Sequence, residues 1–353
     1  NNFKKITSYK FKSIEQFEFT QPELIFTSDK SIIFFDGNGS IFKINSNLKE
    51  IWKVNYYSKN EKKLNPILYI EQDNQNLIIA DTLSKYYSIN LINGELLWSK
   101  ESYSPFNSNI KIYKDSFFVL DFDNVLRCFS TVDGKELWNF ETENSFIKSQ
   151  KKLSLILKGE IVYFINNIGD LTALNANDGS LIWQTPTQSN LIYQNAFKLE
   201  NSDLVYANNS IYFSNNKNEL FSIDAKSGIV NWKQNVNSKL RSTIVENTIF
   251  SVSQEGFLFV VDSKKGNIIR ASNLFENLKN KKNKIVPVGF ILGKNKIYLS
   301  LSNGSLIKVD IFNGVEEKIF KLHGSKISRP YVLNGDIFII RDNSIIKSGK
   351  DDT

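Results

Sequence analysis

The sequence holds few side chains that could perform acid–base or nucleophilic chemistry. His323 is the only histidine among 353 residues, and Cys128 is the only cysteine. Catalysis by an imidazole would therefore depend on His323, which lies in a short segment that we expect to be a loop. Cys128 lies in the apolar stretch 125–129, which predicts a buried strand residue. One His and one Cys exclude an ordinary zinc site, and a single cysteine excludes an intrachain disulfide.

Two short polar motifs resemble ligand-binding loops but lack the residues that would complete them. Asp121-Phe-Asp123-Asn124 begins like a calcium loop, yet it has neither the central Gly nor the distal Glu of an EF-hand. Asp36-Gly-Asn-Gly39 is rich in glycine, yet no Lys-Ser/Thr pair follows it as in a phosphate-binding loop. Both motifs are typical of tight turns between strands. We therefore expect no catalytic residue, no metal and no cofactor.

The elements that would position any functional residue are indicated by the tryptophans. Four of the five tryptophans follow a turn glycine by four residues, and a polar residue precedes each glycine by four. Trp52 occupies the same position in a shorter version that lacks the glycine. The four complete repeats carry Trp98, Trp138, Trp183 and Trp232. Because every tryptophan occupies one position of one repeat, the chain is expected to be a repeat architecture.

The spacing of this repeat indicates the kind of fold. Successive tryptophan-equivalent positions lie 38 to 49 residues apart, and each interval contains short apolar runs of strand type. Four strands in a repeat of this length are typical of a propeller blade, and no helical periodicity of useful length occurs between them. We expect an all-β, eight-bladed β-propeller in which each indole packs on the neighbouring blade. Arg270 and Lys318 replace Trp in repeats six and seven, which predicts weaker docking there or a different means of burial.

The eighth repeat stops near residue 347, before the strand that would carry a tryptophan. An unpaired sheet edge invites association with other chains. We therefore expect the N-terminal stretch Ile14–Phe19 to supply the outermost strand of the last blade. The prediction is one domain at 14–347, with residues 1–13 as a tail.

Composition and charge indicate no nucleic-acid partner. The formal net charge is +7, but lysines are spread along the whole chain. The one dense run, 279–284, is expected to be a solvated loop or a contact with a partner or lipid headgroups. No apolar run approaches the ~18 residues that span a bilayer. The sequence contains no methionine, so we expect a processed N-terminus with an export signal upstream of Asn1.

The repeat resembles the PQQ-type propeller repeat, and within that superfamily the chain is similar to the BamB family of outer-membrane assembly lipoproteins. The shared pattern is aliphatic, any residue, aliphatic, Asp or Asn, three residues, Gly, three residues, Trp. Residues 326–345 are similar to the terminal blade of BamB proteins, and the resemblance covers roughly residues 14 to 347. It implies a non-catalytic scaffold at the periplasmic face of the outer membrane, anchored by a lipid on a Cys upstream of Asn1. The implied partners are a POTRA domain of BamA and other barrel-assembly subunits.

The resemblance also implies where the partner binds. In the family the contact uses a loop between the third and fourth blades and acidic residues before the next blade. These positions fall here on Phe146, Ile147 and Lys148, and on Glu200 and Asp203. The family's Leu-x-Leu-Arg pattern is not reproduced in this loop. Ordinary inter-blade connections contain residues of the same kind, so that interpretation stays open.

Two other functions fit the same repeat. Quinone-dependent dehydrogenases share it, so a PQQ-like enzyme or a small-molecule binder that uses the axial channel is one alternative. The vicinal cysteine pair of those enzymes is excluded here by the single Cys. A generic periplasmic sensor or interaction propeller is the other alternative, and the sequence upstream of Asn1 would separate it from a lipoprotein.

Overall fold

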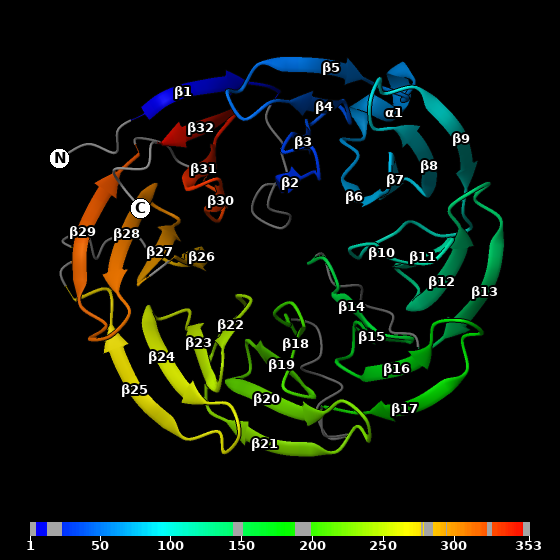
Figure 1. Ribbon diagram of the computed structural model, residues 1–353. Coiled ribbons are helices and arrows are strands. Elements are labelled where there is room, and N and C mark those ends of the chain that lie inside the picture. The colour runs from blue at the N-terminus through cyan, green and yellow to red at the C-terminus, as the bar shows by residue number, and fades with distance from the viewer. Residues whose placement is uncertain are drawn as a thin grey trace.

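The computed structural model describes residues 5–12, 23–143, 151–187, 199–276, 278, 285–293, 295–322 and 327–348. Within these residues the strands form eight four-stranded antiparallel sheets, which are arranged as the blades of a closed ring (Figure 1). The fold is therefore the eight-bladed β-propeller that the repeat predicts. In the described part of the chain the only helix is α1 (Lys59–Lys63), in the connection between the first two blades.

Blades one to four follow one another along the chain, each running from an innermost to an outermost strand. Blade one contains β2 (Ile25–Phe26), β3 (Ile32–Phe35), β4 (Ile41–Ile44) and β5 (Glu50–Val54). Blade two contains β6 (Leu68–Asp73), β7 (Asn76–Asp81), β8 (Lys85–Asn90) and β9 (Leu96–Glu101). Blade three contains β10 (Lys111–Tyr113), β11 (Ser116–Leu120), β12 (Val125–Ser130) and β13 (Glu136–Glu141). Blade four contains β14 (Leu155–Lys158), β15 (Ile161–Ile165), β16 (Leu171–Asn175) and β17 (Leu181–Thr185).

Blades five to seven repeat this order, and blade eight combines both ends of the chain. Blade five contains β18 (Val205–Ala207), β19 (Ser210–Asn215), β20 (Glu219–Asp224) and β21 (Val230–Gln234). Blade six contains β22 (Thr243–Val245), β23 (Thr248–Val252), β24 (Phe257–Asp262) and β25 (Ile268–Asn273). Blade seven contains β26 (Pro287–Leu292), β27 (Lys296–Leu301), β28 (Ser305–Asp310) and β29 (Glu316–Lys321). Blade eight contains β30 (Tyr331–Leu333), β31 (Asp336–Arg341), β32 (Ser344–Ser348) and β1 (Lys5–Lys10).

The last blade is closed by an N-terminal strand, as predicted, but the strand begins earlier in the chain than expected. β1 pairs antiparallel with β32, and Tyr9 lies opposite Ile345. This strand falls within the segment expected to be a tail, so the predicted domain boundary at residue 14 is wrong. The predicted strand Ile14–Phe19 lies outside the described residues.

Tyr9 gives a physical reason for the position of the closing strand. Its ring packs edge-on against Phe34 and Phe42 of blade one, with centroids 5.8 and 5.9 Å away. Its hydroxyl donates a hydrogen bond to the Glu50 carboxylate on the outermost strand of blade one. β1 thus completes blade eight and also docks that blade on blade one.

The two middle strands of the blades are mostly buried, although β24 of blade six is only half buried. In blade two, Leu77, Ile78, Ile79 and Ala80 of β7 all have 0% exposure. Neighbouring blades cover both faces of such a strand, so its sequence is a continuous apolar run rather than an alternating one. The outermost strand β9 is mostly exposed. The hydrophobic core consequently lies between the blades as a series of layers.

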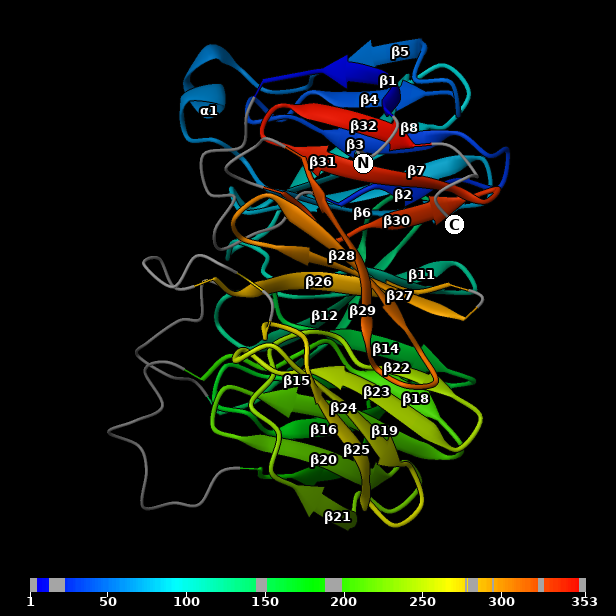
Figure 2. The same ribbon diagram turned by 90° about the vertical axis from the view of Figure 1, so that its left-hand side faces the viewer.

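The direction of the chain gives the ring two different faces. Every innermost strand begins on the face that carries α1, and every outermost strand ends on this α1 face (Figure 2). The turns between third and fourth strands lie on the opposite face, which we call the turn face. Residues that directly precede innermost strands therefore meet around the axis on the α1 face.

Each tryptophan lies against the turn glycine of the next blade. A Cβ built on Gly134 would lie 2.6 Å from the Trp98 ring, and this glycine has φ +69°. The Trp98 indole Nε1 donates to the carbonyl oxygen of Thr131 in the same turn, at 3.0 Å. The glycine thus supplies both the left-handed turn and the space for the ring. The same contact with a turn glycine is made by Trp52 with Gly94, Trp138 with Gly179, Trp183 with Gly228, and Trp232 with Gly266. The Nε1 hydrogen bond recurs for Trp52, Trp183 and Trp232, whereas the buried Trp138 Nε1 has no hydrogen-bond partner among the described residues.

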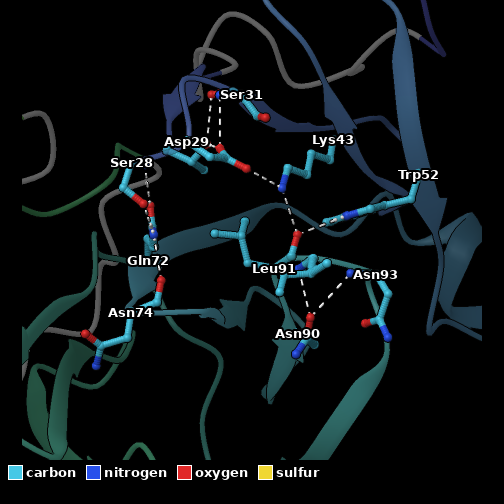
Figure 3. A network of polar contacts seen from close by, with 12 residues as sticks. Ser28, Asp29, Ser31, Lys43, Trp52, Gln72, Asn74, Asn90, Leu91 and Asn93 are labelled. Carbon is cyan, nitrogen blue, oxygen red and sulfur yellow. Dashed lines mark hydrogen bonds and ion pairs between the residues drawn. The ribbon is translucent and has the colours of Figure 1, made fainter.

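The junction between blades one and two adds a buried cation to this arrangement (Figure 3). The carbonyl oxygen of Leu91 accepts hydrogen bonds from Trp52 Nε1 and from Lys43 Nζ, each at 3.1 Å. Lys43 also forms an ion pair with Asp29 at 2.7 Å. Buried amino groups need such partners, because desolvation without pairing is costly. This polar network therefore fixes the contact between the two blades.

The two positions without tryptophan differ from each other. Arg270 takes the place of an indole between blades six and seven. Its guanidinium donates to the carbonyl oxygen of Ile311 at 2.7 Å and to that of Phe312, in the turn that an indole would contact. Lys318 has no equivalent turn to contact, because the fourth strand of blade eight comes from the other end of the chain. Its amino group instead lies 4.5 Å from the ring centroid of Phe320.

Candidate functional site on the ring axis

Within the described ranges, charged residues precede five of the eight innermost strands by two or three positions. They are Glu23 before β2, Lys152 before β14, Asp203 before β18, Arg241 before β22 and Arg329 before β30. Because the innermost strands lie around the ring axis (Figure 1) and begin on the α1 face, the residues that directly precede them lie near the axis on that face. We call this set, together with Lys151, Glu200 and Lys239, the axial mouth.

A serine fixes the backbone next to two of these charged residues. Ser328 Oγ accepts a hydrogen bond from Ile340 N at 3.0 Å and donates to the carbonyl oxygen of Arg329 at 2.7 Å. Ser202 makes the same pair of bonds next to Asp203 before β18. The serine hydroxyl joins the backbone before the innermost strand to the second strand. The backbone position from which the next, charged side chain projects is therefore fixed. Ser108 repeats the arrangement before β10.

An ion pair crosses the axis at the mouth. Glu23 Oε1 and Lys152 Nζ lie 2.6 Å apart, although Glu23 belongs to blade one and Lys152 to blade four. These blades are three positions apart in the ring, so the pair crosses the ring axis rather than a junction between neighbouring blades. The Lys152 side chain is 17% exposed and the Glu23 side chain 42% exposed. The mouth is therefore occupied by its own charged side chains but stays open to approach from solvent.

The charges at the mouth shift one another's pKa values. Burial alone would raise the pKa of Glu23, but Lys152 and Arg329 outweigh it, so the pKa is lowered. The pKa of Asp203 is likewise lowered, because the surrounding cations outweigh the effect of burial. For Lys152 burial acts to lower the pKa, but Glu23 and Asp203 raise it overall. These groups consequently remain ionised at neutral pH.

Lys151 differs from its neighbour Lys152. Its Nζ donates to the carbonyl oxygen of Lys239 at 2.8 Å and to that of Asn201. Burial lowers the pKa of Lys151 to about 8. Lys239 itself forms an ion pair with Glu200. The backbone and side chains of the connections before β14, β18 and β22 are thereby linked by one polar network.

The structure places two of the five predicted partner-binding residues in the axial mouth. Asp203 lies among its cations, and Glu200 is paired with Lys239 at its edge. Phe146, Ile147 and Lys148 lie outside the described residues. Sequence reasoning missed Glu23, Lys152 and Arg329, which share the mouth with Asp203. A usable signal was present, because Ser202-Asp203 and Ser328-Arg329 are the same Ser-charged pair directly before an innermost strand.

The other motifs considered for chemistry have structural roles. Asp121 Oδ1 accepts from Asp123 N at 2.8 Å and from Val125 N at 3.0 Å, which confirms a turn between strands. Asp36 does the same in blade one, so Asp36-Gly-Asn-Gly39 is also a turn. Cys128 is buried, and burial raises the pKa of its thiol to about 12. His323 lies outside the described residues.

No metal-binding group of three or more His, Cys, Asp or Glu occurs within the described ranges. A pocket beside the axial mouth is lined by Lys151, Asn166, Asn201 and their neighbours. It has room for about one water molecule. This pocket is too small for a quinone. Over the part of the chain that the structure describes, no helix is long and apolar enough to cross a membrane.

Comparisons with known proteins agree with this architecture. No curated protein sequence matches the chain significantly. Among solved structures, BamB from Moraxella catarrhalis matches with a TM-score of 0.76 and 13% identity, over 98% of this chain and 99% of that one. The computationally designed Ika8 protein matches with a TM-score of 0.70 and 12% identity, over 96% and 99% of the two chains. The C-terminal WD40 domain of Sif2 matches with a TM-score of 0.73 and 10% identity, over 99% of this chain and 98% of that one.

At these identities the structural matches show the fold alone. The family is shown by a different comparison, in which the family model described as outer membrane protein assembly factor BamB matches residues 37–272. The matched segment is about two thirds of the chain and runs from the turn between β3 and β4 of blade one to the last strand of blade six. The protein therefore belongs to the family of the outer membrane protein assembly factor BamB.

Proposed function

We propose that this protein is a non-catalytic scaffold in outer-membrane β-barrel assembly, and that it binds a POTRA domain of BamA through the axial mouth. Family membership is the observation that carries the proposal. The protein would act at the periplasmic face of the outer membrane, held there by an N-terminal lipid. Other barrel-assembly subunits are further expected partners.

The electrostatics of the axial mouth support its use as a docking surface. Charges of both signs are held there by short backbone segments, and Arg241 is exposed at the rim. Partly exposed charges on a rigid framework favour fast and specific association, because complementary charges on a partner steer its approach. The ring supplies that framework, since β1 ties the two ends of the chain together.

Calorimetric titration with purified BamA POTRA domains tests the proposal. The wild-type protein is expected to bind with a Kd of tens of micromolar or lower, and higher salt is expected to weaken the complex. Asp203→Asn and Glu200→Gln are expected to weaken it by about tenfold or more, because each acid holds a cation of the mouth in place: Asp203 acts on Lys152, and Glu200 pairs with Lys239. Asp115→Asn is the matched control, because Asp115 is an exposed acid in the β10–β11 turn on the turn face. Absence of binding by the wild-type protein would contradict the proposal.

A further inference from the structure

We propose that the axial mouth binds an acidic side chain of a partner polypeptide, and that the carboxylate of Glu23 occupies this site in the free protein. The inference rests on the proposed function and deepens it, because it names the chemistry that the partner presents. Glu23 would act as an internal ligand that an aspartate or glutamate of the partner replaces.

The cations of the mouth converge on the Glu23 carboxylate from different blades. Lys152 of blade four contacts it directly at 2.6 Å, across the axis. Arg329 of blade eight also acts on it, since it contributes to the lowered pKa of Glu23. The Arg329 guanidinium lies 4.6 Å from the ring centroid of Tyr331, which holds the planar group in one orientation. A lysine and an oriented arginine around one point are a typical carboxylate-binding arrangement.

The mouth carries an excess of positive charge even when Glu23 is counted. Its five cations face three anions, which leaves a net charge of +2 (5 − 3). If the Glu23 side chain turned away, the remaining two anions would leave +3 (5 − 2) around Lys152. A carboxylate supplied from outside would restore the charge balance that Glu23 provides. The cations are Lys151, Lys152, Lys239, Arg241 and Arg329, and the anions are Glu23, Glu200 and Asp203.

Glu23 can leave the site without disrupting the blade. It lies before β2, which has two residues and is the shortest of the innermost strands, while the others have three to six. Two residue pairs join β2 to β3. The main chain is held by the next residue, Leu24, which is buried in the core between blades one and eight. A rotation of the Glu23 side chain therefore frees Lys152 at little structural cost.

A protruding acidic residue fits this site better than an enclosed small molecule. The adjoining pocket has room for about one water molecule, so the cations are reached from the α1 face rather than from within a cavity. Arg241 is exposed at the rim, where it would meet the approaching chain first. A short acidic segment on the surface of a partner has the reach and the charge that this geometry requires.

Fluorescence anisotropy with a labelled tetraglutamate peptide tests the inference, with tetraglutamine as the uncharged probe. Glu23→Gln keeps the shape of the side chain but removes its charge, so it is expected to bind tetraglutamate about five- to tenfold more tightly than wild type. Adding Lys152→Gln to Glu23→Gln is expected to abolish this gain. Lys152→Gln alone is expected to bind tetraglutamate no more tightly than wild type. Lys265→Gln is the matched cation control, because Lys265 is exposed in the β24–β25 turn on the turn face. Circular dichroism verifies that each variant is folded.

The inference is overturned if Glu23→Gln binds tetraglutamate no more tightly than wild type, or if the gain persists without Lys152. It is also overturned if tetraglutamine gains equally. Binding of the POTRA domains to the same variants separates the two proposals. If tetraglutamate shows the expected gain but no POTRA domain binds, the proposed function fails while the carboxylate site stands. If POTRA domains bind but Glu23→Gln shows no gain in either assay, only the present inference fails.

Discussion

The indole of Trp183 lies so close to Gly228 of the next blade that a Cβ on the glycine would come within 2.6 Å of the ring. Trp183 Nε1 donates to the carbonyl oxygen of Ala225, three residues before that glycine, at 3.1 Å. The turn therefore offers the indole a flat surface and a hydrogen-bond acceptor at once. The tryptophan and the glycine act as one unit, since the ring fits only where the side chain is absent.

Adding a methyl group at this contact is expected to destabilise the ring. Gly228→Ala should lower the free energy of unfolding by about 2–4 kcal/mol, because it combines a positive φ with overlap on the ring. Gly159→Ala is the matched control, since Gly159 also has positive φ (+59°) but no atom of the described residues lies within 4 Å of the point where its Cβ would be. It should cost only the backbone strain of about 1–2 kcal/mol. Urea denaturation measures both values, and equal losses would show that the indole contact contributes nothing.

Arg270 is expected to behave as a substitute for tryptophan. Arg270→Ala removes both hydrogen bonds to the turn of blade seven and should cost about 1–3 kcal/mol. Arg270→Trp should keep most of the stability, because Gly314 has the φ of +70° found at the other indole contacts. Thermal denaturation of the two variants compares them directly. A Tm for Arg270→Trp as low as that of Arg270→Ala would contradict this interpretation.

A buried ion pair in blade three joins strand β12 to the turn that precedes it and should matter for stability. Arg127 Nε lies 2.8 Å from Asp121 Oδ2, with side-chain exposures of 11% and 0%. Arg127→Met should cost about 3–5 kcal/mol, because it leaves a buried carboxylate without its partner. Adding Asp121→Asn should recover part of that loss, since the amide oxygen can still accept from the turn. A double variant less stable than Arg127→Met would contradict the pairing argument.

Lys151 is expected to make stability depend on pH. Its pKa of about 8 in the folded protein lies below the ordinary lysine value of 10.5, so the unfolded chain holds the proton more tightly. Between about pH 8 and 10.5 the unfolded state carries more protons, and the Lys151 contribution to stability therefore rises with pH. Lys151→Met should remove this rise, while Lys265→Met should keep it. Urea denaturation between about pH 7.5 and 9.5 provides the comparison, and identical slopes for wild type and Lys151→Met would be the contrary result.

Much of the fold follows from local chemistry that a sequence displays. The Trp–Gly interval and the Asx-type residue before each turn are short-range features, because Asp224 Oδ1 accepts from Lys226 N and Ser227 N within one turn. The place of the closing strand is not local in this sense, because pairing with β32 is a contact between the two chain ends. Its position depends on Tyr9 fitting against blade one, and periodicity in the N-terminal segment does not encode that fit.

The axial mouth is harder to predict than the blades. The resemblance indicates Glu200 and Asp203, but the Glu23–Lys152 pair joins residues 129 positions apart across the ring. Such a contact arises only when the eight blades close into a ring. Neither residue lies in an apolar strand of the repeat, so the repeat pattern does not indicate it. The Ser-charged pairs before β18 and β30 are visible in the sequence, although their common role becomes evident only with the backbone bonds of the serines.

A partner that docks at the axial mouth must lie against the α1 face of the ring. Site-specific photo-crosslinking to BamA POTRA domains reveals which face the partner contacts, with the reactive amino acid placed in turn at positions 203, 241, 115 and 265. Crosslinks are expected from positions 203 and 241 and none from positions 115 and 265, which lie on the turn face. Crosslinks confined to 115 or 265, or a complex that forms without any crosslink from the mouth, would contradict docking at the axial mouth.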